Sequence, residues 1–179
     1  MPVFLHAACG PATKADVPIN NFRDWDELRL DIDDQYNPDI VGDIRGGRWV
    51  GQYNERLDGV YCSHALEHLH LFDVPKALRS FFDVLKPNGF LCVFVPNFQA
   101  ACRFVAEGRE EKIYDAPCGP IYAQDIIFGH NMMSANNEHM RHRCGFTPAL
   151  LRGLLLGAGF IVTDVRVDDL NIFMTGQKL

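Results

Sequence analysis

Apolar residues gather in short runs of strand length along the first hundred residues of the chain. These runs occupy residues 2–9, 28–33, 38–44, 57–64 and 90–97. The last of them, FLCVFVPN, is almost continuously apolar, which is typical of a strand that is covered on both faces of its sheet. The pattern therefore predicts five strands in the first half of the chain.

A helical period separates the fourth run from the fifth. Apolar side chains recur there at intervals of three and four residues, at Val74, Ala77, Leu78, Phe81, Phe82 and Leu85. The sequence KPNG at 86–89 joins a proline to a turn glycine, so we expect it to end the helix. Strand, helix, turn and strand form a crossover unit, which predicts a sheet that is at least partly parallel.

The end of the chain predicts a second helix and a hairpin. Thr147 suits the N-cap of this helix and Pro148 its first position. Its apolar face consists of Leu150, Leu151, Leu154 and Leu155. Two alternating runs after residue 160, joined by DDLN, predict an antiparallel hairpin. The predicted fold class is therefore α/β, a doubly wound and mostly parallel sheet with a C-terminal antiparallel hairpin, in a single domain over 1–179.

Residues 98–146 show no sustained period beyond a helical turn or two in ACRFVAEG. An irregular stretch of this length inside a compact domain is more often a functional lid than a structural connector. We therefore predict that this segment covers a ligand or contributes to a substrate site.

Composition and charge exclude some partners. The chain is 47% hydrophobic and 22% charged, with a formal net charge of -6. This charge disfavours a nucleic-acid footprint, because phosphate binding needs a basic surface. The RHR cluster at 141–143 is interpreted as solvated surface. No apolar run reaches membrane-spanning length and the N-terminus lacks signal-peptide features, so we expect a soluble, cytoplasmic protein.

The cysteines do not form a recognisable metal or disulfide motif. Six are scattered along the chain without a C-x-x-C pair, which predicts reduced and mostly buried thiols. His139, His142 and Cys144, in the pattern H-x-x-H-x-C, offer three soft ligands for zinc. No fourth ligand stands at a suitable spacing, so the prediction is that the protein holds no metal.

Polar residues follow the ends of the first four predicted strands. In open α/β sheets, ligands bind outside the carboxyl ends of the strands, where the strand order reverses. This rule selects Cys9, Gly10, Pro11, Asp31, Asp33, Asp43, Ser63 and His64. Asp31 lies twenty-one residues after Gly10. That separation is close to the ~20 residues expected of an acid that binds ribose hydroxyls.

The turn after the first strand suits a nucleoside better than a dinucleotide. The three glycines of a G-x-G-x-x-G loop correspond here to Ala8, Gly10 and Thr13, so two of the three positions fail. Pro11 also removes a backbone donor that a pyrophosphate would need. A ligand without phosphates requires only one close backbone approach, at Gly10, together with the carboxylates. A nicotinamide-dependent oxidoreductase is disfavoured on this ground.

Six stretches occur in a characteristic order: FLHAACGP, LRLDID, IVGDIR, LDGVYCSHALEHL, ALRSFFDVLKPNGFLCVFVPN and HRCGFTPALLRGLLLGAGF. Together they resemble the class I S-adenosylmethionine-dependent methyltransferases, most of all the small bacterial branch with LEHL and VLKPNG motifs. The similarity covers nearly the whole chain and is strongest over 57–97. It implies a seven-stranded, Rossmann-like sheet whose last strand is antiparallel, and S-adenosylmethionine as the cofactor.

The resemblance assigns separate parts of the cofactor to the strand ends. It implies that Gly10 faces the methionyl and ribose part, that Asp31 holds the ribose hydroxyls and that Asp43 meets the adenine. Ser63 and His64 are expected beside the methionine end. The complete predicted cofactor site is Ala8, Cys9, Gly10, Pro11, Asp31, Ile32, Asp43, Ile44, Ser63 and His64.

The first loop departs from the family pattern. His6 stands in place of the usual acid, and Ala8 and Ala12 replace the first and third glycines. The chain also starts directly at its first strand, without helices that roof the cofactor. Two expectations follow: either the affinity for the cofactor is low, or the segment 98–146 supplies the roof.

Methyl transfer places modest demands on the protein. The cofactor supplies the reactivity, and the protein aligns donor and acceptor and, for an oxygen acceptor, provides a base. Because histidine titrates near neutrality, His142 is the first candidate for this base and His130 the second. Asp115 and Tyr122 are predicted to position the substrate.

The pair Glu67 and His68 in ALEHL is open to two interpretations. It has the composition of a catalytic acid–imidazole pair, but adjacent residues on a helix point in different directions. The favoured interpretation is that Glu67 accepts hydrogen bonds from backbone donors at a helix start and interacts with the helix dipole.

The sequence thus predicts a methyltransferase that acts on a small-molecule, sugar or lipid-linked acceptor. The fourth strand is not followed by the N/D-P-P-[YF] loop of many amino-methyltransferases, which disfavours DNA bases as acceptors. The alternative prediction is a non-catalytic nucleoside-binding or regulatory domain of the same fold.

Overall fold

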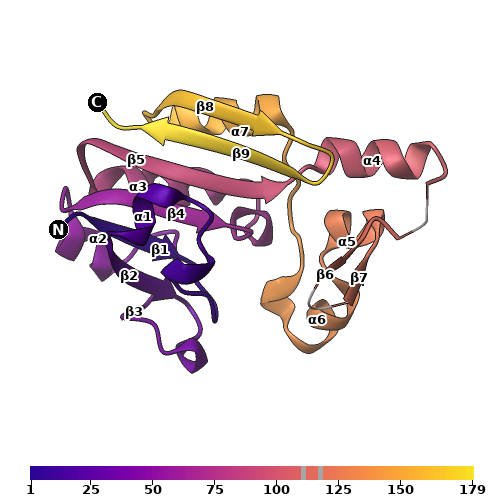
Figure 1. The fold of residues 1–179 in the computed structure, drawn as a ribbon, viewed down its shortest axis with the longest axis horizontal. Helices are drawn as coiled ribbons and strands as arrows, with labels where there is room; N and C mark the ends of the chain where they lie inside the picture. The colour runs from indigo at the N-terminus through magenta and orange to yellow at the C-terminus, as the bar shows by residue number, and fades with distance from the viewer. Residues whose placement is uncertain (110–111, 117–118) are drawn as a thin grey trace.

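The computed structural model describes residues 1–109, 112–116 and 119–179 of the chain. Its main sheet has seven strands in the order β3-β2-β1-β4-β5-β9-β8 (Figure 1). Their bounds are β1 Val3–Ala7, β2 Asp26–Asp31, β3 Ile40–Val41, β4 Leu57–Ser63, β5 Leu85–Pro96, β8 Ile161–Val167 and β9 Asn171–Gln177. Strands β1 to β5 are parallel to one another, and β9 runs antiparallel between β5 and β8. The predicted α/β fold class, with its antiparallel C-terminal hairpin, is confirmed.

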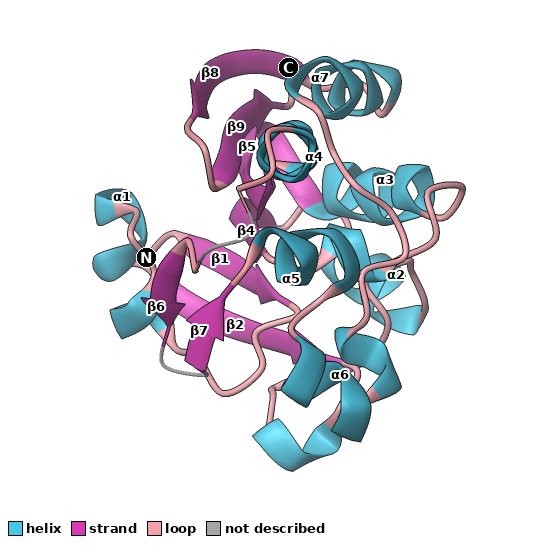
Figure 2. Ribbon diagram, turned by 90° about the vertical axis from the view of Figure 1, so that its right-hand side faces the viewer, coloured by secondary structure: helices cyan, strands magenta, loops and turns pink. Residues whose placement is uncertain are grey.

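Helices lie on both faces of the sheet (Figure 2). One face carries α2 (Arg48–Tyr53), α3 (Val74–Val84) and α7 (Pro148–Gly157). These helices and the central strands enclose the larger apolar cluster. The other face carries the short α1 (Asn20–Arg23) and the 3-10 turn η1 (Lys14–Asp16). Its smaller cluster consists of Phe4, Val17, Phe22, Tyr61, Cys92 and Phe173.

The apolar face that the sequence period predicts for α3 is buried in the structure. Four of the predicted apolar positions, Val74, Ala77, Leu78 and Phe81, are completely buried. The helix ends at Val84, but the following KPNG sequence is not a free turn. It belongs to β5, where the register with β4 shifts and Asn88 takes a left-handed φ of 67°. A bulged strand start therefore replaces the expected connecting turn.

Helix α7 begins as the capping pattern predicts. The Thr147 hydroxyl accepts a hydrogen bond from the backbone N–H of Leu150, and Pro148 is the first helical residue. The side chains of Leu151 and Leu155 are completely buried against the sheet, whereas Leu150 and Leu154 are partly buried.

The segment 98–146 contains more regular structure than the sequence indicates. It holds α4 (Phe98–Ala106), β6 (Tyr114–Ala116), β7 (Gly119–Ile121), α5 (Ala123–Phe128), α6 (Asn131–Asn136) and the 3-10 turn η4 (Glu138–Met140). Strands β6 and β7 form a separate two-stranded sheet. Together these elements form a lobe beyond the carboxyl ends of the parallel strands (Figure 1). Most are too short to show a hydrophobic period.

Both ends of this lobe are fixed to the main sheet. Asn97, which follows β5, caps α4 by accepting from Ala100 N and donates through its side-chain amide to Asp168 O at 2.6 Å. Asn97 also forms an isolated parallel bridge with Phe146, whose side chain is completely buried. The lobe therefore leaves and rejoins the sheet at the same place.

Two further 3-10 turns lie at strand ends, η2 (Asp34–Tyr36) after β2 and η3 (Leu66–His68) after β4. Within the described part of the chain, no helix has both the length and the apolar character needed to cross a membrane.

Candidate functional site

A cavity of about 460 Å³ opens at the carboxyl ends of β1 to β4. Residues from the predicted cofactor site that line it are Ala8, Cys9, Gly10, Pro11, Asp31, Ile32, Asp43, Ile44 and His64. Ser63 alone of that predicted set does not line it. The structure thus brings together residues from four strand ends, although their individual roles in binding stay predictions.

Asp31 joins the ends of the first two strands. Its carboxylate is 7% exposed and accepts a hydrogen bond from Gly10 N at 2.7 Å and another from Asp33 N at 2.9 Å. Each carboxylate oxygen keeps one further lone-pair site for another donor, such as a hydroxyl. Asp31 therefore fixes the loop and still has the capacity to bind a ligand.

Gly10 supplies the close backbone approach that the sequence predicts. It has a φ of 51°, and a Cβ built at this position meets no atom within 4 Å. The backbone of this residue therefore borders open space in the cavity, in a left-handed conformation that glycine adopts without strain.

Arg29 holds the same loop from the opposite side. Its guanidinium donates to Gly10 O at 2.7 Å and to the carbonyls of Tyr36 and Asn37 at 3.2 Å each. This role of Arg29 was not predicted, because a single arginine inside a strand carries no signal of the loops that it reaches.

Ala8 adopts the conformation of the glycine that it replaces. Its φ is 51°, in the left-handed region that costs a residue with a Cβ roughly 1–2 kcal/mol. The substitution Ala8→Gly removes this strain but adds backbone entropy to the unfolded chain, at a cost of roughly 0.5–1 kcal/mol. We therefore expect Ala8→Gly to raise the free energy of unfolding by about 0.5–1 kcal/mol, measured by urea denaturation.

Ala7→Gly is the matched control for this prediction. Ala7 is the last residue of β1 and is completely buried, so the same change there only loses packing and gains flexibility. We expect that variant to be less stable than the wild type. If both substitutions destabilise the protein equally, Ala8 is not strained.

Asp43 lies in the cavity wall as part of an ion-pair network. Arg45 donates to its two carboxylate oxygens at 2.5–3.0 Å and reaches Asp73 at 3.2 Å. Burial favours the neutral form of Asp43, but the hydrogen bonds from Arg45 outweigh it and lower the pKa of this carboxyl. Asp43 is therefore ionised and oriented before any ligand arrives. Arg45 also lines the cavity and was not predicted.

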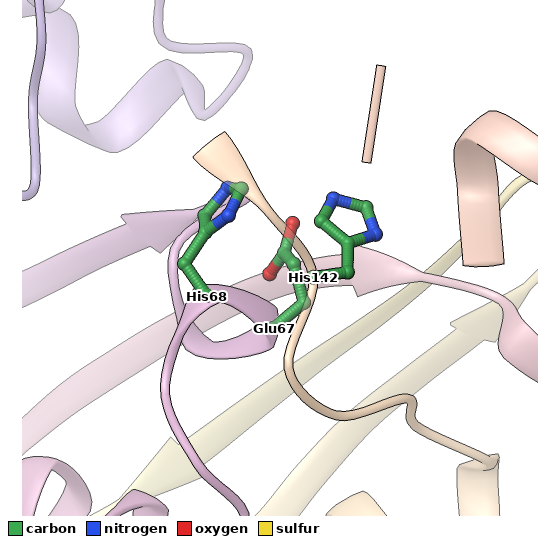
Figure 3. A group of neighbouring side chains, drawn as sticks. All are labelled: Glu67, His68 and His142. Atoms are coloured by element: carbon green, nitrogen blue, oxygen red, sulfur yellow. The ribbon is translucent and has the colours of Figure 1, made fainter. Parts of the chain in front are cut away.

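The surroundings of Glu67 differ from those that the sequence predicts. It lies in the three-residue turn η3 and is 1% exposed, and its two carboxylate oxygens have no hydrogen-bond partner among the described residues. The interpretation of Glu67 as an acceptor for backbone donors is therefore wrong. Figure 3 shows its carboxylate between the rings of His68 and His142, and one ligand atom from each of the three residues lies within 4.8 Å of the other two. The expectation that Glu67 and His68 diverge fails because a short 3-10 turn is not a regular helix.

His64 is the side chain that lies opposite Glu67 at the cavity. Its Nδ1 lies 3.4 Å from Glu67 Oε1, and its side chain is 52% exposed. Desolvation disfavours the charged imidazole, but the Glu67 carboxylate outweighs it and raises the pKa of His64. Burial similarly opposes ionisation of Glu67, yet His64 and the more distant imidazoles lower its pKa.

Neither of the two predicted catalytic histidines lines the cavity at the strand ends. His142 does not line the cavity, but its ring packs on that of His68, which does, with the ring centroids 5.0 Å apart. Burial lowers the pKa of His142, which favours the neutral ring that a base requires. His130 lines a second cavity of about 530 Å³ within the lobe. The catalytic role of each histidine stays a prediction.

The predicted substrate residues are not in the cofactor cavity. Tyr122 lines the second cavity with His130. Asp115 is exposed on β6, where it pairs with Lys112 at 2.6 Å. The structure does not bring these two residues to the strand ends, and their role also stays a prediction.

The lobe supplies the wall that faces the strand ends. Its residues in the cavity are Met133, Asn137, His139, Met140 and Arg143. This arrangement agrees with the expected position of a roof. The RHR cluster is divided, because Arg141 and Arg143 are exposed whereas His142 is partly buried.

The cysteines described by the structure are free thiols, as the sequence predicts. Cys9, Cys62 and Cys92 are buried, and burial raises the pKa of Cys92 to about 11. Cys118 lies outside the described residues. His139 and Cys144 do not join His142 in a cluster of potential ligand atoms among the described residues, whereas Glu67 and His68 do.

Comparison with known proteins agrees with this geometry. A family model described as a methyltransferase domain matches residues 8–165 of the chain. No curated protein matches the sequence.

Solved structures share the fold at low sequence identity. The 1,6-didemethyltoxoflavin-N1-methyltransferase of Burkholderia thailandensis, which binds 1,6-didemethyltoxoflavin and S-adenosylhomocysteine, is 19% identical with a TM-score of 0.59. The match covers 99% of this chain and 71% of that one.

Two further structures match 99% of this chain. An S-adenosylmethionine-dependent methyltransferase of Mesorhizobium loti is 13% identical, with a TM-score of 0.62 and 90% of its chain covered. A protein of Pyrococcus horikoshii is also 13% identical, with a TM-score of 0.67 and 82% covered. The family match and the shared fold identify this chain as a methyltransferase, a member of the methyltransferase domain family with the fold of S-adenosylmethionine-dependent enzymes.

Proposed function

We propose that the chain transfers a methyl group from S-adenosylmethionine, bound in the cavity at the strand ends, to a small-molecule, sugar or lipid-linked acceptor. The observation that carries this proposal is the convergence of Gly10, Asp31 and Asp43 from separate strand ends on one cavity. The sequence predicted these three residues as contacts for different parts of one nucleoside.

The residues present fit this cofactor. Asp31 has lone pairs available for two ribose hydroxyls. Each carboxylate oxygen of Asp43 already accepts two hydrogen bonds from Arg45, so an exocyclic amino group would bind there by displacing one of them. Ile32 and Ile44 add apolar surface to the same wall. Because S-adenosylmethionine carries no phosphate group, its binding does not need the backbone donor that Pro11 lacks or a glycine in place of Ala12.

The chemistry is divided between cofactor and protein. When bound, S-adenosylmethionine supplies an activated methyl group on a sulfonium sulfur. The protein contributes binding and orientation: Arg29 and Asp31 fix the Gly10 loop from its two sides. The lobe residues from 133 to 143 shield the opposite wall from water.

A small or extended acceptor suits the site better than nucleic acid. The formal net charge is -6, and the acidic side chains Asp31, Asp33 and Asp43 all line the cavity. Arg45 and Arg143 line the cavity as well, so three carboxylates against two guanidinium groups leave a small negative balance, which disfavours a phosphodiester backbone. The 1,6-didemethyltoxoflavin bound by the Burkholderia thailandensis enzyme is a small molecule.

The test combines binding with turnover. Isothermal titration calorimetry is expected to show one S-adenosylhomocysteine bound per chain, and radiolabelled S-adenosylmethionine is expected to transfer its methyl group to a member of a small-molecule acceptor panel. Absence of S-adenosylhomocysteine binding at high protein concentration would refute the proposal. Binding without transfer to any acceptor would favour the non-catalytic nucleoside-binding alternative.

A further inference from the structure

Glu67, His68 and His142 bring three potential metal ligands to one place (Figure 3). One ligand atom from each residue lies within 4.8 Å of the other two. The residues come from two distant parts of the chain. They meet because the carbonyl of Glu67 accepts a backbone hydrogen bond from Arg143 N at 2.7 Å and another from Cys144 N at 3.3 Å. Backbone pairing therefore fixes the separation between the turn η3 and residue 142.

Both imidazole rings are oriented by backbone carbonyls. Nδ1 of His68 lies 3.2 Å from Arg141 O, and Nδ1 of His142 lies 2.9 Å from Ile126 O. A carbonyl oxygen only accepts hydrogen bonds, so Nδ1 carries the proton in each ring. In the neutral tautomer, Nε2 then has the free lone pair. Metal-binding histidines have this arrangement, in which one ring nitrogen donates to a carbonyl or carboxylate and the other binds the ion.

The Glu67 carboxylate is an independent sign of a missing ligand. Its side chain is 2% exposed, and neither oxygen has a hydrogen-bond partner in the described part of the chain. A buried carboxylate whose oxygens lack hydrogen bonds is costly even where an imidazole lies near it. His64 Nδ1 lies 3.4 Å from the carboxylate, but that contact does not satisfy hydrogen-bond geometry.

We propose that Glu67, His68 and His142 bind a divalent transition-metal cation of the zinc class. Two imidazoles and one carboxylate are a donor set that Zn²⁺ accepts with a fourth position open, whereas Mg²⁺ prefers oxygen ligands. Ligand atoms around tetrahedral zinc lie roughly 3.4 Å apart. Each side-chain tip therefore needs to move by less than about 1 Å from its position in this structure.

This site differs from the zinc motif that the sequence suggests. The H-x-x-H-x-C pattern pairs His142 with His139 and Cys144, but the Cys144 thiol faces the carbonyls of Leu66 and Glu67 instead. The proposed cation lies in the wall of the cofactor cavity, because His68 also lines that cavity. Its binding does not depend on the proposed methyl donor.

The experiment measures Zn²⁺ binding to the untagged full chain after treatment with a chelator. Isothermal titration calorimetry is expected to show one tight equivalent of Zn²⁺ that a large excess of Mg²⁺ does not displace. Co²⁺ is expected to produce a visible absorption band, which Zn²⁺ abolishes. Failure of the wild-type chain to bind either ion saturably would overturn the proposal.

Variants locate the site. Glu67→Gln, His68→Asn and His142→Asn are each expected to weaken Zn²⁺ binding by at least about tenfold, because even the loss of an outer partner of a metal ligand has effects of that order. His139→Asn, which alters the alternative motif, is expected to keep the wild-type affinity. Retained affinity in His68→Asn and His142→Asn, or its loss only in His139→Asn, would contradict the assignment.

Two controls keep the result interpretable. Circular dichroism verifies that each variant folds, and if Glu67→Gln does not, the partly buried His68 and His142 decide the outcome. A separate titration of the wild type with S-adenosylhomocysteine distinguishes failure of the metal site from failure of the proposed function. Zn²⁺ binding without nucleoside binding would still support the metal site.

Discussion

Asp31→Ala is expected to weaken S-adenosylhomocysteine binding by roughly 10- to 150-fold, or about 1.5–3 kcal/mol. This is the range for losing a hydrogen-bond partner that carries a charge. Asp31 has two functions in the structure, and the substitution removes both. Its carboxylate faces the cavity, and it also anchors the backbone N–H groups of Gly10 and Asp33. Isothermal titration calorimetry of both proteins measures the difference.

The matched control for this prediction is Asp26→Ala. Asp26 is the first residue of the same strand, at the edge of the sheet opposite the cavity, and its side chain is exposed. We expect that variant to bind S-adenosylhomocysteine with wild-type affinity. Equal affinities for Asp31→Ala and the wild type would show that this acid does not contact the nucleoside.

Phe146→Ala is expected to lower the free energy of unfolding by about 3–5 kcal/mol, as is usual for a buried phenylalanine. Phe146 is completely buried in the larger apolar cluster. Its carbonyl also accepts from Phe98 N at 3.2 Å, which closes the lobe onto the sheet. Since a domain of this size has roughly 5–15 kcal/mol of stability, the loss removes a large fraction of it. Urea denaturation followed by circular dichroism measures the change.

Phe128→Ala gives the comparison within the same lobe. The Phe128 side chain is 67% exposed, so its truncation is expected to change stability by less than about 0.5 kcal/mol. A loss below about 1 kcal/mol for Phe146→Ala would mean that the lobe is not anchored at this residue.

The fold could be predicted because its elements carry local signals. The α3 periodicity, the Thr147 cap and the alternating C-terminal strands are each visible in a short window of sequence. The elements of the lobe escaped prediction because they are short. Strands β6 and β7 have only three residues each, so neither sets up a period of its own.

Most residues of the cofactor cavity could also be predicted, because ligands of open α/β sheets bind outside the carboxyl ends of the strands. This rule does not say which of two neighbouring side chains faces the ligand. Ser63 is the last residue of β4 and His64 follows it, and of the two only His64 lines the cavity. His64 leaves the strand with a left-handed φ of 50°, which was not visible in the sequence.

The contacts that the sequence did not reveal join distant segments. Arg29 reaches the Gly10 loop, and His68 meets His142 across 74 residues of sequence. The first contact depends on the pairing of β1 with β2 and the second on how the lobe rejoins the sheet, and no local pattern encodes either. Glu67 was misinterpreted for the same reason, because its neighbours in space come from another segment.

A crystal structure of the chain with S-adenosylhomocysteine tests most directly whether the nucleoside binds in the cavity at the strand ends. We predict both ribose hydroxyls within about 3 Å of the Asp31 carboxylate, with the adenine beside Asp43 and Ile44. A nucleoside bound instead in the second cavity, next to Tyr122 and His130, would contradict this prediction.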